Sequence, residues 1–440
     1  MKKILLYVLI VFLLVPFTVI GQTYTTLKVI GNELKDSKGN NVVLKGVNYN
    51  LLDDGNIKLT PTNQTYHNYI NQVALTGANS IRIPWFTDEF PHWRKNYPNN
   101  GTPQAALVGG QLSNLLAYCH TKGLIPILEL HDYTCDNNWS NFNNKIRNWW
   151  LQPSVLQLIE THKEYLIINI ANEFGKVRWT TNQTQSLNTF KVNYQNLIGD
   201  LRQAGVDVPI MIDAPDCGQS SSELLSISSN LLSSDSQANL IFSAHTYWYG
   251  YAGTTQAIDT KISEILNSNV CFVFGEVSNR QDVTGNQVDG VYNLDAIYQH
   301  VLLRSCQNSI GVLIWAFNHD WHVDREMSPT SNVSNLTPFG NDILYNSVYG
   351  FINGNCQSRL SNDVNALGFS YYPNPTSGYV FFDKTDSFIS IDIFDNLGRH
   401  LKKISSDFEF IDMTNFSEGM YLFTIRTTNG VTNAKIVLKK

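Results

Sequence analysis

Charged side chains are scarce in this sequence. Asp, Glu, Lys and Arg make up 15% of the 440 residues, against about 25% in an average protein. The formal net charge is −6, and Lys and Arg form no basic stripe. The composition therefore gives no reason to expect a nucleic-acid partner.

Cysteine is also scarce, with six in the chain, and there is no C-x-x-C pair or His–Cys cluster at metal-binding spacing. We therefore predict no metal and no cofactor. An even number of cysteines permits disulfides in an exported protein, but the spacing selects no pairing, and a chain of this length does not need such bridges. Cys271 lies in an apolar run and is expected to be a packed thiol.

Long apolar runs are absent after the N-terminus. The first residues combine Lys2 and Lys3 with an apolar stretch at 4–20 and a small-residue cleavage site at Gly21. This pattern predicts a cleaved signal peptide over 1–21. The mature protein is then expected to be secreted or held at the cell surface, monomeric and without a transmembrane segment.

Eight short apolar runs begin near residues 43, 79, 124, 165, 208, 238, 270 and 311. Helical spacing is predicted between and after them, over 66–76, 105–122, 149–163, 183–204, 221–229, 255–267, 294–308 and 339–349. Near-continuous apolar runs are typical of strands buried on both faces, and hence parallel. Eight such units predict a (β/α)8 TIM barrel over 22–355. An open doubly wound sheet is disfavoured, because no Gly-rich phosphate loop follows a strand.

The pattern changes after residue 355. A polar linker is predicted over 356–369, and 370–440 contains short alternating strands near 379–382, 388–394, 421–425 and 434–438. Turn residues separate these strands, which predicts a small all-β sandwich domain.

Polar side chains stand at the ends of most predicted barrel strands. Two strands end in Glu173 and Glu276. A carboxylate at the end of a buried strand is costly unless the site uses it, although each Glu alone could simply begin a solvated loop. Two carboxylates on one barrel rim, with aromatic neighbours, predict glycoside hydrolysis, in which one Glu is the acid and the other the nucleophile. The pattern alone does not say which is which.

The remaining strand ends predict supporting roles. Arg82 would keep one Glu ionised, Asn172 would bind a sugar 2-hydroxyl, and His245 and Tyr247 would orient the carboxylates. Trp315 and Trp248 would offer flat faces to sugar rings. Further aromatic residues follow strand ends, where groove walls are expected: Trp85, Tyr133, Trp139, Trp179 and Tyr249. The alternative is structural: Arg82 as a core ion pair, and His131 and His245 as partners of buried backbone.

Several motifs together resemble those of clan A glycoside hydrolases, specifically family 5, over residues 25–353. They are G-V-N at 46–48, N-S-I-R-I-P at 79–84, L-E-L-H-D at 128–132, I-A-N-E at 170–173, H-T-Y at 245–247, F-G-E at 274–276 and I-W-A-F at 314–317. The resemblance implies that Glu173 is the acid/base and Glu276 the nucleophile, with retention of configuration. It also implies supporting roles for Arg82, His131, Asn172, His245, Tyr247 and Trp315.

Two further stretches, 212–219 and 336–341, look most like bacterial mannanase-type members of that family. The sequences at 316–320 and at Asp216-Cys217 depart from the expected pattern, so mannan and glucan both stay open as the polysaccharide substrate. A catalytically silent polysaccharide-binding protein is the alternative from another class. An esterase is disfavoured, because no G-x-S-x-G motif occurs.

The tail resembles the C-terminal sorting domain of the type IX secretion pathway, through Y-P-N-P-T-S-G at 372–378 and the strands that follow. This resemblance implies that residues 370–440 bind the secretion machinery. A carbohydrate-binding module is disfavoured, since the tail has no Trp to stack on a sugar.

Overall fold

The computed structural model describes residues 24–52, 59, 65–87, 102–282, 290–320, 322–355 and most of 370–440. The chain divides into two compact units, Met1–Cys356 and Gln357–Lys440. The predicted signal peptide and the predicted linker at 356–369 lie outside the described residues.

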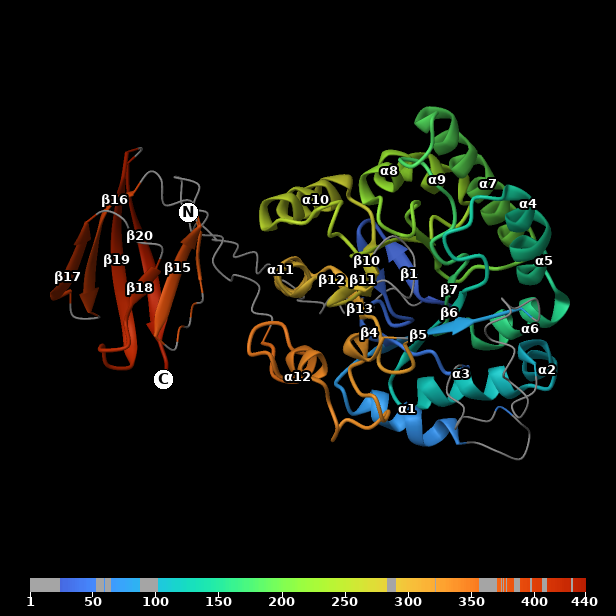
Figure 1. The fold of residues 1–440 in the computed structure, drawn as a ribbon, viewed down its shortest axis with the longest axis horizontal. Coiled ribbons are helices and arrows are strands. Elements are labelled where there is room, and N and C mark those ends of the chain that lie inside the picture. Colours follow the sequence, from blue (N-terminus) through green and yellow to red (C-terminus); the bar gives the residue numbers. More distant parts are fainter. Residues whose placement is uncertain are drawn as a thin grey trace, which may run out of the picture. The chain divides into compact units, whose positions relative to one another are not determined.

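Eight parallel strands close into a barrel in the first unit (Figure 1). They are β4 (Lys45–Asn48), β5 (Ser80–Trp85), β6 (Ile125–Leu130), β7 (Ile167–Asn169), β8 (Ile210–Asp213), β9 (Leu240–His245), β10 (Phe272–Val277) and β13 (Gly311–Ile314). Neighbours follow chain order, and β13 closes the barrel by pairing with both β10 and β4. The predicted barrel and its eight strands are confirmed.

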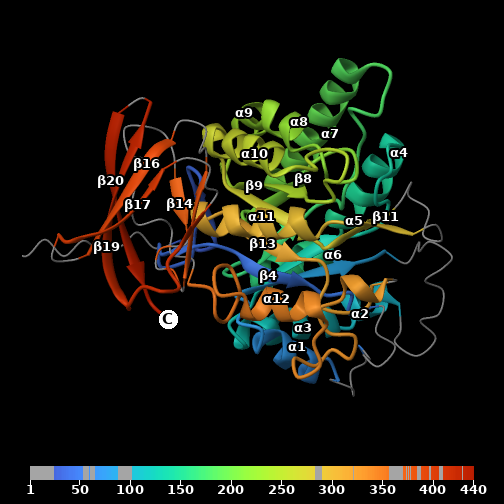
Figure 2. The same cartoon turned by 60° about the vertical axis from the view of Figure 1, so that its left-hand side comes forward.

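Helices surround the strands, as Figures 1 and 2 show. They are α1 (Tyr66–Ala74), α2 (Pro103–Val108), α3 (Gln111–Thr121), α4 (Trp139–Asn141), α5 (Arg147–Trp150), α6 (Pro153–His162), α7 (Gln183–Gln203), α8 (Ser221–Ser226), α9 (Ser228–Ser234), α10 (Thr255–Ser268), α11 (Asp295–Asn308) and α12 (Pro338–Tyr345). A π-helical turn, Phe142–Ile146, joins α4 to α5, and a short 3-10 turn covers Val323–Arg325.

Four predicted elements are corrected by the structure. The helix predicted over 149–163 is two helices, α5 and α6, because Pro153 begins a new helix. The helix predicted over 105–122 is two helices, because Gly110 has a left-handed φ of 81° that ends α2 and begins α3. The helix predicted over 221–229 is likewise divided, into α8 and α9. The strand predicted to run to Glu173 ends at Asn169, and Glu173 has a φ of 52°, which no strand residue adopts.

The N-terminal end of the barrel is closed by apolar side chains. A small antiparallel sheet of β1 (Lys28–Ile30), β2 (Glu33–Lys35) and β3 (Asn41–Val42) lies there. Its Leu27, Val29 and Leu34 share one buried cluster with inward-facing strand residues, including Ile127, Ile167, Met211, Ile241, Val273 and Leu313. The opposite, C-terminal end is where barrel sites are found.

The second unit is all-β, with two antiparallel sheets. One contains β14 (Ser370–Tyr372), β15 (Tyr379–Asp383) and β18 (Phe410–Asp412), and the other β16 (Phe388–Asp395), β17 (His400–Ser405), β19 (Gly419–Thr427) and β20 (Gly430–Leu438). Buried side chains from both sheets, such as Val380 and Ile411 on one and Ile391 and Phe423 on the other, form one core. This confirms the predicted sandwich.

The hairpin of β11 (Arg280–Asp282) and β12 (Val291–Asn293) follows β10 at the C-terminal end of the barrel. Among the described residues, none of the helices combines the length and apolar character needed to cross a membrane.

Candidate active site

Two carboxylates meet at the C-terminal end of the barrel. Glu173 follows β7, Glu276 lies in β10, and His245 ends β9. One oxygen from each carboxylate and a ring nitrogen of His245 all lie within 4.8 Å of one another. Glu173 is 6% exposed and Glu276 3%. The prediction that two strands deliver their Glu residues to one rim is therefore confirmed as geometry.

Glu276 is held by donors on both oxygens. Arg82 Nη1 donates to its Oε1 at 2.9 Å, and the Tyr247 hydroxyl donates to its Oε2 at 2.7 Å. Burial raises the pKa of Glu276, while the neighbouring His245 and Arg82 charges pull it down and the Glu173 charge adds to the rise. Burial and the Glu276 charge also raise the pKa of Tyr247 well above its usual value, so the phenol keeps the proton it donates.

Arg82 is fully buried beneath the two carboxylates. Its N–H groups donate to Asn169 Oδ1 (2.9 Å), Asn48 Oδ1 (2.8 Å), Glu276 Oε1 (2.9 Å), Asn172 Oδ1 (2.7 Å) and Asp213 Oδ2 (3.3 Å). Burial lowers the pKa of Arg82, but the charges of Glu129, Asp213 and Glu276 outweigh it and raise the pKa above its usual value. A permanent positive charge thus lies under Glu276.

Glu173 is oriented by His245. The ring Nδ1 faces Glu173 Oε1 at 2.7 Å, and the backbone N–H of Glu173 points to Asp213 Oδ2 at 3.4 Å. Burial lowers the pKa of His245, but the Glu276 and Asp213 charges raise it to about 10, so the ring donates from Nδ1 at neutral pH. Burial alone would raise the pKa of Asp213, yet His245 and Arg82 hold it well below its usual range.

Two glycines make room for the His245 ring. A Cβ on Gly218 would lie 2.6 Å from His245 Cγ, and one on Gly275 would lie 3.0 Å from Nε2. Both positions therefore require glycine if the imidazole is to keep its place beside Glu173.

A second group of predicted residues lines the other side of the rim. His131 Nδ1 lies 2.9 Å from Glu129 Oε2, and its ring is parallel to that of Trp315, with centroids 5.7 Å apart and planes 8° apart. The Trp315 indole N–H donates to Asp320 Oδ2, which fixes the ring plane. Trp315 is 8% exposed, so it keeps a small accessible surface.

Some of the aromatic residues predicted to contact the substrate are buried, and others are exposed. Trp248 is fully buried, packs edge-on against Phe274 and donates its indole N–H to Gln219 O at 3.1 Å, so the prediction that it stacks on a sugar is wrong. Trp85 is also fully buried and cannot be a groove wall. Trp139 packs among core aromatics, whereas Trp179 and Tyr249 are 51% and 52% exposed.

Arg82 and His245 are fully buried and touch the carboxylates rather than an open surface. Asn172 is 1% exposed, and its Nδ2 donates to Thr134 Oγ1 at 3.0 Å, while its Oδ1 accepts from Arg82. Arg82 contacts Glu276 and His245 contacts Glu173, whereas the Asn172 side chain reaches the carboxylates only through Arg82. A contact between Asn172 and a sugar hydroxyl stays a prediction.

Four further buried polar residues belong to the site: Asn48, Glu129, Asn169 and Asp213. The sequence placed Asn48 and Asp213 among the polar strand ends without a specific role, and it did not single out Glu129 or Asn169. Asn48 and Asp213 end barrel strands, and Asn169 is the one polar residue of β7. A lone polar residue inside an apolar strand is the signal for such positions, because it must find a buried partner. Here that partner is Arg82.

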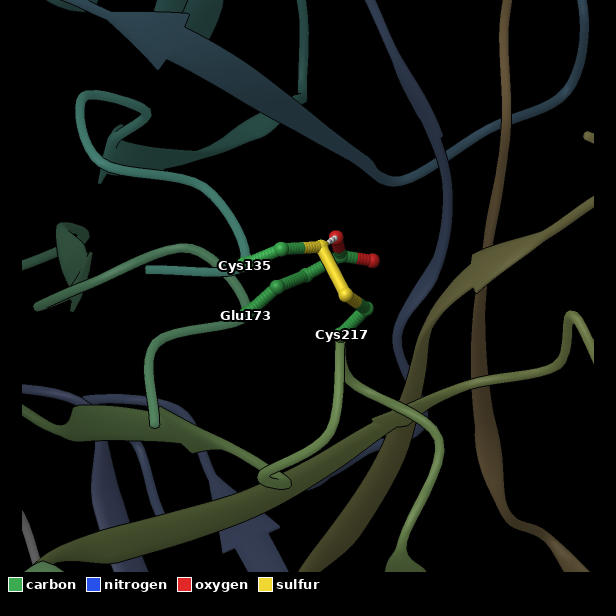
Figure 3. Close-up of side chains that lie close together, drawn as sticks. All are labelled: Cys135, Glu173 and Cys217. Carbon is green, nitrogen blue, oxygen red and sulfur yellow. Dashed lines mark hydrogen bonds between the residues drawn. A yellow bond between two sulfur atoms is a disulfide. The ribbon is translucent and has the colours of Figure 1, made fainter. Parts of the chain in front are cut away.

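The site also contains a disulfide bond. Cys135 and Cys217 are linked, Cys306 is disulfide-bonded as well, and the described free cysteines are the buried Cys119 and Cys271. Burial raises the pKa of Cys271 to about 12, in keeping with the predicted packed thiol. Figure 3 shows the Cys135–Cys217 bridge beside the Glu173 carboxylate.

Two clusters come close enough to be considered as metal sites. In the first, Glu173 lies beside Cys135 and Cys217, but disulfide sulfurs carry no negative charge and are poor ligands. In the second, Glu173 and Glu276 lie beside His245. Glu173 already binds Nδ1 of His245, and Glu276 already accepts from Arg82 and Tyr247. The absence of a metal stays a prediction.

Replacement of Arg82 by methionine is expected to destabilise the barrel by about 3–5 kcal/mol, the range for breaking a buried ion pair by removing one partner. His245 still lowers the pKa of Asp213 in this variant, but the contribution of the Arg82 charge disappears. In the native protein, ionised Asp213 contributes its full stabilisation at any pH above its pKa in the unfolded chain. This contribution is lost only as the pH falls through the depressed pKa that Asp213 has in the folded protein. The difference between variant and native protein is therefore largest at neutral pH and shrinks on acidification.

Denaturant unfolding followed by Trp fluorescence measures this difference, because all nine Trp residues lie between 85 and 321. The matched control is Arg147→Met, which removes a half-exposed pair with Asp200 and should cost less than about 1 kcal/mol. An equal, small cost for both variants would contradict the central role given to Arg82.

Comparison with known proteins gives two family matches. Residues 35–320 match the family described as Cellulase (glycosyl hydrolase family 5), and residues 370–439 match the family described as Secretion system C-terminal sorting domain. The two matches cover the barrel up to Asp320 and nearly all of the sandwich.

Among curated proteins, a mannan endo-1,4-beta-mannosidase of Cellvibrio japonicus is 27% identical over 333 residues, which cover 74% of this chain and 67% of that protein. An enzyme with the same name from Salipaludibacillus agaradhaerens is 24% identical over 72% of this chain and 89% of its own length. A protein of Caldicellulosiruptor saccharolyticus named beta-mannanase/endoglucanase A is 25% identical over 61% of this chain and 18% of its own length.

Among solved structures, the beta-mannanase from Streptomyces thermolilacinus with mannohexaose is similar to this chain, with a TM-score of 0.58 and 21% identity. The match covers 74% of this chain and 95% of that one. At this identity the likeness establishes the barrel fold alone.

Proposed function

Since the chain belongs to glycosyl hydrolase family 5, we propose that it is a secreted, retaining endo-β-1,4-mannanase. The glycoside hydrolase activity follows from the family, and the curated relatives are endo-acting glycanases. The observation that carries the proposed chemistry is the approach of Glu173 and Glu276 to within 4.8 Å at one rim. Retaining enzymes hold their two carboxyl groups about 5–5.5 Å apart, and inverting enzymes about 6.5–9.5 Å.

In the proposed first step, Glu276 attacks the anomeric carbon while Glu173 gives its proton to the glycosidic oxygen. The bond to the leaving sugar breaks, and a glycosyl–Glu276 ester forms. Arg82 and Tyr247 hold the attacking carboxylate in place, each through one of its oxygens. Burial disfavours the ionised form of Glu276 that a nucleophile needs, and the hydrogen bonds from Arg82 and Tyr247 favour it.

In the proposed second step, Glu173 removes a proton from water, which attacks the same anomeric carbon from the side that the leaving sugar vacated. Glu276 leaves as a carboxylate, and the product keeps the β configuration. His245 binds Glu173 Oε1 throughout, so Oε2 is the oxygen that exchanges the proton.

The assignment of mannan rests on the names of the relatives. Those of Cellvibrio japonicus and Salipaludibacillus agaradhaerens are mannan endo-1,4-beta-mannosidases. An endo-β-1,4-glucanase is the second candidate, because the more distant relative of Caldicellulosiruptor saccharolyticus carries both activities in its name. Release of reducing sugar from mannan, glucomannan, cellulose and xylan, measured side by side, separates the candidates.

We expect the fastest release from mannan and glucomannan. Faster release from cellulose would support the glucanase, and no release from any of the four polymers would support a non-catalytic polysaccharide-binding protein. Retention is tested separately by proton NMR, in which the β anomer of the new reducing end should appear before mutarotation.

The sandwich is a sorting domain of the type IX secretion pathway. We infer from it that the barrel travels to the cell surface or beyond, with residues 370–440 as the part that the secretion machinery binds. The cleaved signal peptide at 1–21 and the monomeric state belong to the same proposal. Mass spectrometry of the exported protein would identify both of its ends.

Replacement of Tyr247 by phenylalanine is expected to move the acidic limb of the kcat/KM profile to higher pH. Burial already raises the pKa of Glu276 above its usual value, and loss of the Tyr247 donor raises it further. The nucleophile must be ionised, so the variant needs a higher pH to reach full activity. The measurement is kcat/KM on a mannan oligosaccharide across pH.

The matched control is Tyr249→Phe, since Tyr249 is 52% exposed and stacks on Tyr292 instead. Its acidic limb should coincide with that of the native enzyme. An unshifted limb in Tyr247→Phe would contradict the assignment of Glu276 as the group that must be ionised.

A further inference from the structure

The Cys135–Cys217 disulfide lies against the oxygen of Glu173 that His245 does not bind. Cys135 Sγ is 3.1 Å from Glu173 Oε2 (Figure 3). His245 Nδ1 is 2.7 Å from Oε1. A sulfur in a disulfide has no proton to donate, so the first contact is one of packing. The two oxygens of one carboxyl group therefore have different neighbours, a cation on one side and a sulfur on the other.

The bridge joins the loops on either side of the Glu173 loop. Cys135 follows β6, Glu173 follows β7 and Cys217 follows β8, and these strands are neighbours in the barrel. The two cysteine Cα atoms are 4.6 Å apart although 82 residues separate them in the chain. The bridge thus spans the Glu173 loop, which lies between the two others.

All three of these residues have left-handed backbone conformations. The φ angles are 59° at Cys135, 52° at Glu173 and 53° at Cys217, values that are uncommon for residues other than glycine. Such conformations persist where the surroundings enforce them, and they cluster at functional sites. A covalent link between the flanking loops is one such constraint.

Backbone hydrogen bonds connect the Glu173 loop to both flanking loops, next to the cysteines. Gly175 N–H donates to Asp136 O at 2.8 Å, and Asp216 N–H donates to Gly175 O at 2.8 Å. Asp136 and Asp216 adjoin Cys135 and Cys217 in the sequence. The bridge and the two hydrogen bonds therefore form one closed frame around residues 173–175.

We propose that the Cys135–Cys217 disulfide is a positioning element for the acid/base carboxyl of Glu173. The proposal rests on the function proposed for Glu173 above. Rotation about the last bond of a Glu side chain is soft, with broad torsional minima. His245 fixes one oxygen, the Cys135 sulfur blocks displacement of the other, and Oε2 is thereby held toward the glycosidic oxygen that it protonates.

The test compares two substrates that differ only in the leaving group, phenyl and 2,4-dinitrophenyl β-mannobioside. Dinitrophenolate leaves without protonation, whereas phenolate needs the acid, and kcat/KM reports the first step. We expect Cys135→Ala/Cys217→Ala to lose on the order of tenfold to hundredfold in kcat/KM on the phenyl substrate, part of the 10²–10⁴-fold that a general acid contributes. On the dinitrophenyl substrate we expect a loss below about threefold.

Reduction of the unmutated bridge is the second measurement, in case the double variant folds poorly. It is done in a Cys306→Ala background, because Cys306 is disulfide-bonded on α11, away from the rim. Dithiothreitol gives two electrons and two protons to the Cys135–Cys217 bridge and becomes a cyclic disulfide. Activity on the phenyl substrate should fall on reduction and return on reoxidation, with little change on the dinitrophenyl substrate.

Glu173→Ala serves as the reference for the loss of acid catalysis. If Glu173→Ala shows the leaving-group dependence and a folded disulfide variant loses activity equally on both substrates, or on neither, the positioning role is overturned and the role of Glu173 survives. If Glu173→Ala itself shows equal losses on both substrates, the proposed role of Glu173 fails and the positioning role fails with it.

Discussion

Replacement of Glu276 by glutamine is expected to reduce kcat on mannan by roughly 10⁴- to 10⁶-fold, the range observed when an enzyme loses one residue of its catalytic unit. The amide cannot form the glycosyl ester, so the first step has no route. The substitution keeps the shape of the side chain and an oxygen that accepts from Arg82, which donates to Oε1 at 2.9 Å. The fold should therefore remain, and the loss should appear with every leaving group.

Glu264→Gln is the matched control, because Glu264 lies on α10, pairs with Lys261 and is 36% exposed in its side chain. It should keep the native rate. A Glu276→Gln variant, purified free of deamidated enzyme, that retains more than about a hundredth of native activity would exclude Glu276 as the nucleophile.

Replacement of Glu173 by alanine is expected to lower kcat/KM on mannan by about 10²- to 10⁴-fold, the contribution of a general acid. The loss should nearly vanish on a dinitrophenyl glycoside, whose leaving group needs no proton. Hydrolysis of the glycosyl ester should also be slow, since no base activates water. Azide, which attacks without a base, should restore turnover and yield a β-glycosyl azide.

The azide product separates the two carboxylates. A β-glycosyl azide means that Glu173 faces the side that the leaving group vacates, whereas an α-glycosyl azide from this variant would mean that Glu173 is the nucleophile. The second result would exchange the roles given to Glu173 and Glu276. Rates should be compared with those of the Glu264 control in the same azide concentrations.

The barrel was predictable from sequence because its strands are buried on both faces and read as short apolar runs. The same logic located Glu173 and Glu276, since a carboxylate at the end of such a run has few structural uses. His245 and Tyr247 followed, because they lie at or just after the end of β9. Arg82 lies in the middle of β5 and was noticed as a charged residue inside an apolar strand. Strand ends meet at one rim in this fold, so no knowledge of pairing order was required.

Other parts of the site depend on contacts that strand ends do not reveal. Asn169 ends β7, but in the sequence it lies inside an apolar run that continues to Ala171. It binds Arg82 at 2.9 Å, a partner 87 residues away. The adjacent Trp248 and Tyr249 are 0% and 52% exposed, and nothing in their sequence neighbourhood distinguishes a core indole from a surface phenol. The cysteines give no pairing from spacing, because 82 residues separate Cys135 from Cys217.

The left-handed φ of 52° at Glu173 was equally hidden. The apolar run that predicts the strand continues through Ile170 and Ala171, and both are fully buried, although β7 ends at Asn169. Residues after Asn169 therefore stay buried although they are no longer in strand conformation. The chain turns there over the barrel rim and is covered by the loops around it. Glu173, the proposed acid/base, lies in that turn and not in the strand.

The most direct test of the two-carboxylate mechanism is covalent trapping. A 2,4-dinitrophenyl 2-deoxy-2-fluoro-β-mannobioside should form the glycosyl ester quickly and lose it slowly, because the fluorine destabilises both transition states while the leaving group rescues only the first. Peptide mass spectrometry of the inactivated enzyme should then find one fluoroglycosyl group on Glu276. A label on Glu173 or on any other residue, or rapid turnover to an α product without a label, would contradict the mechanism.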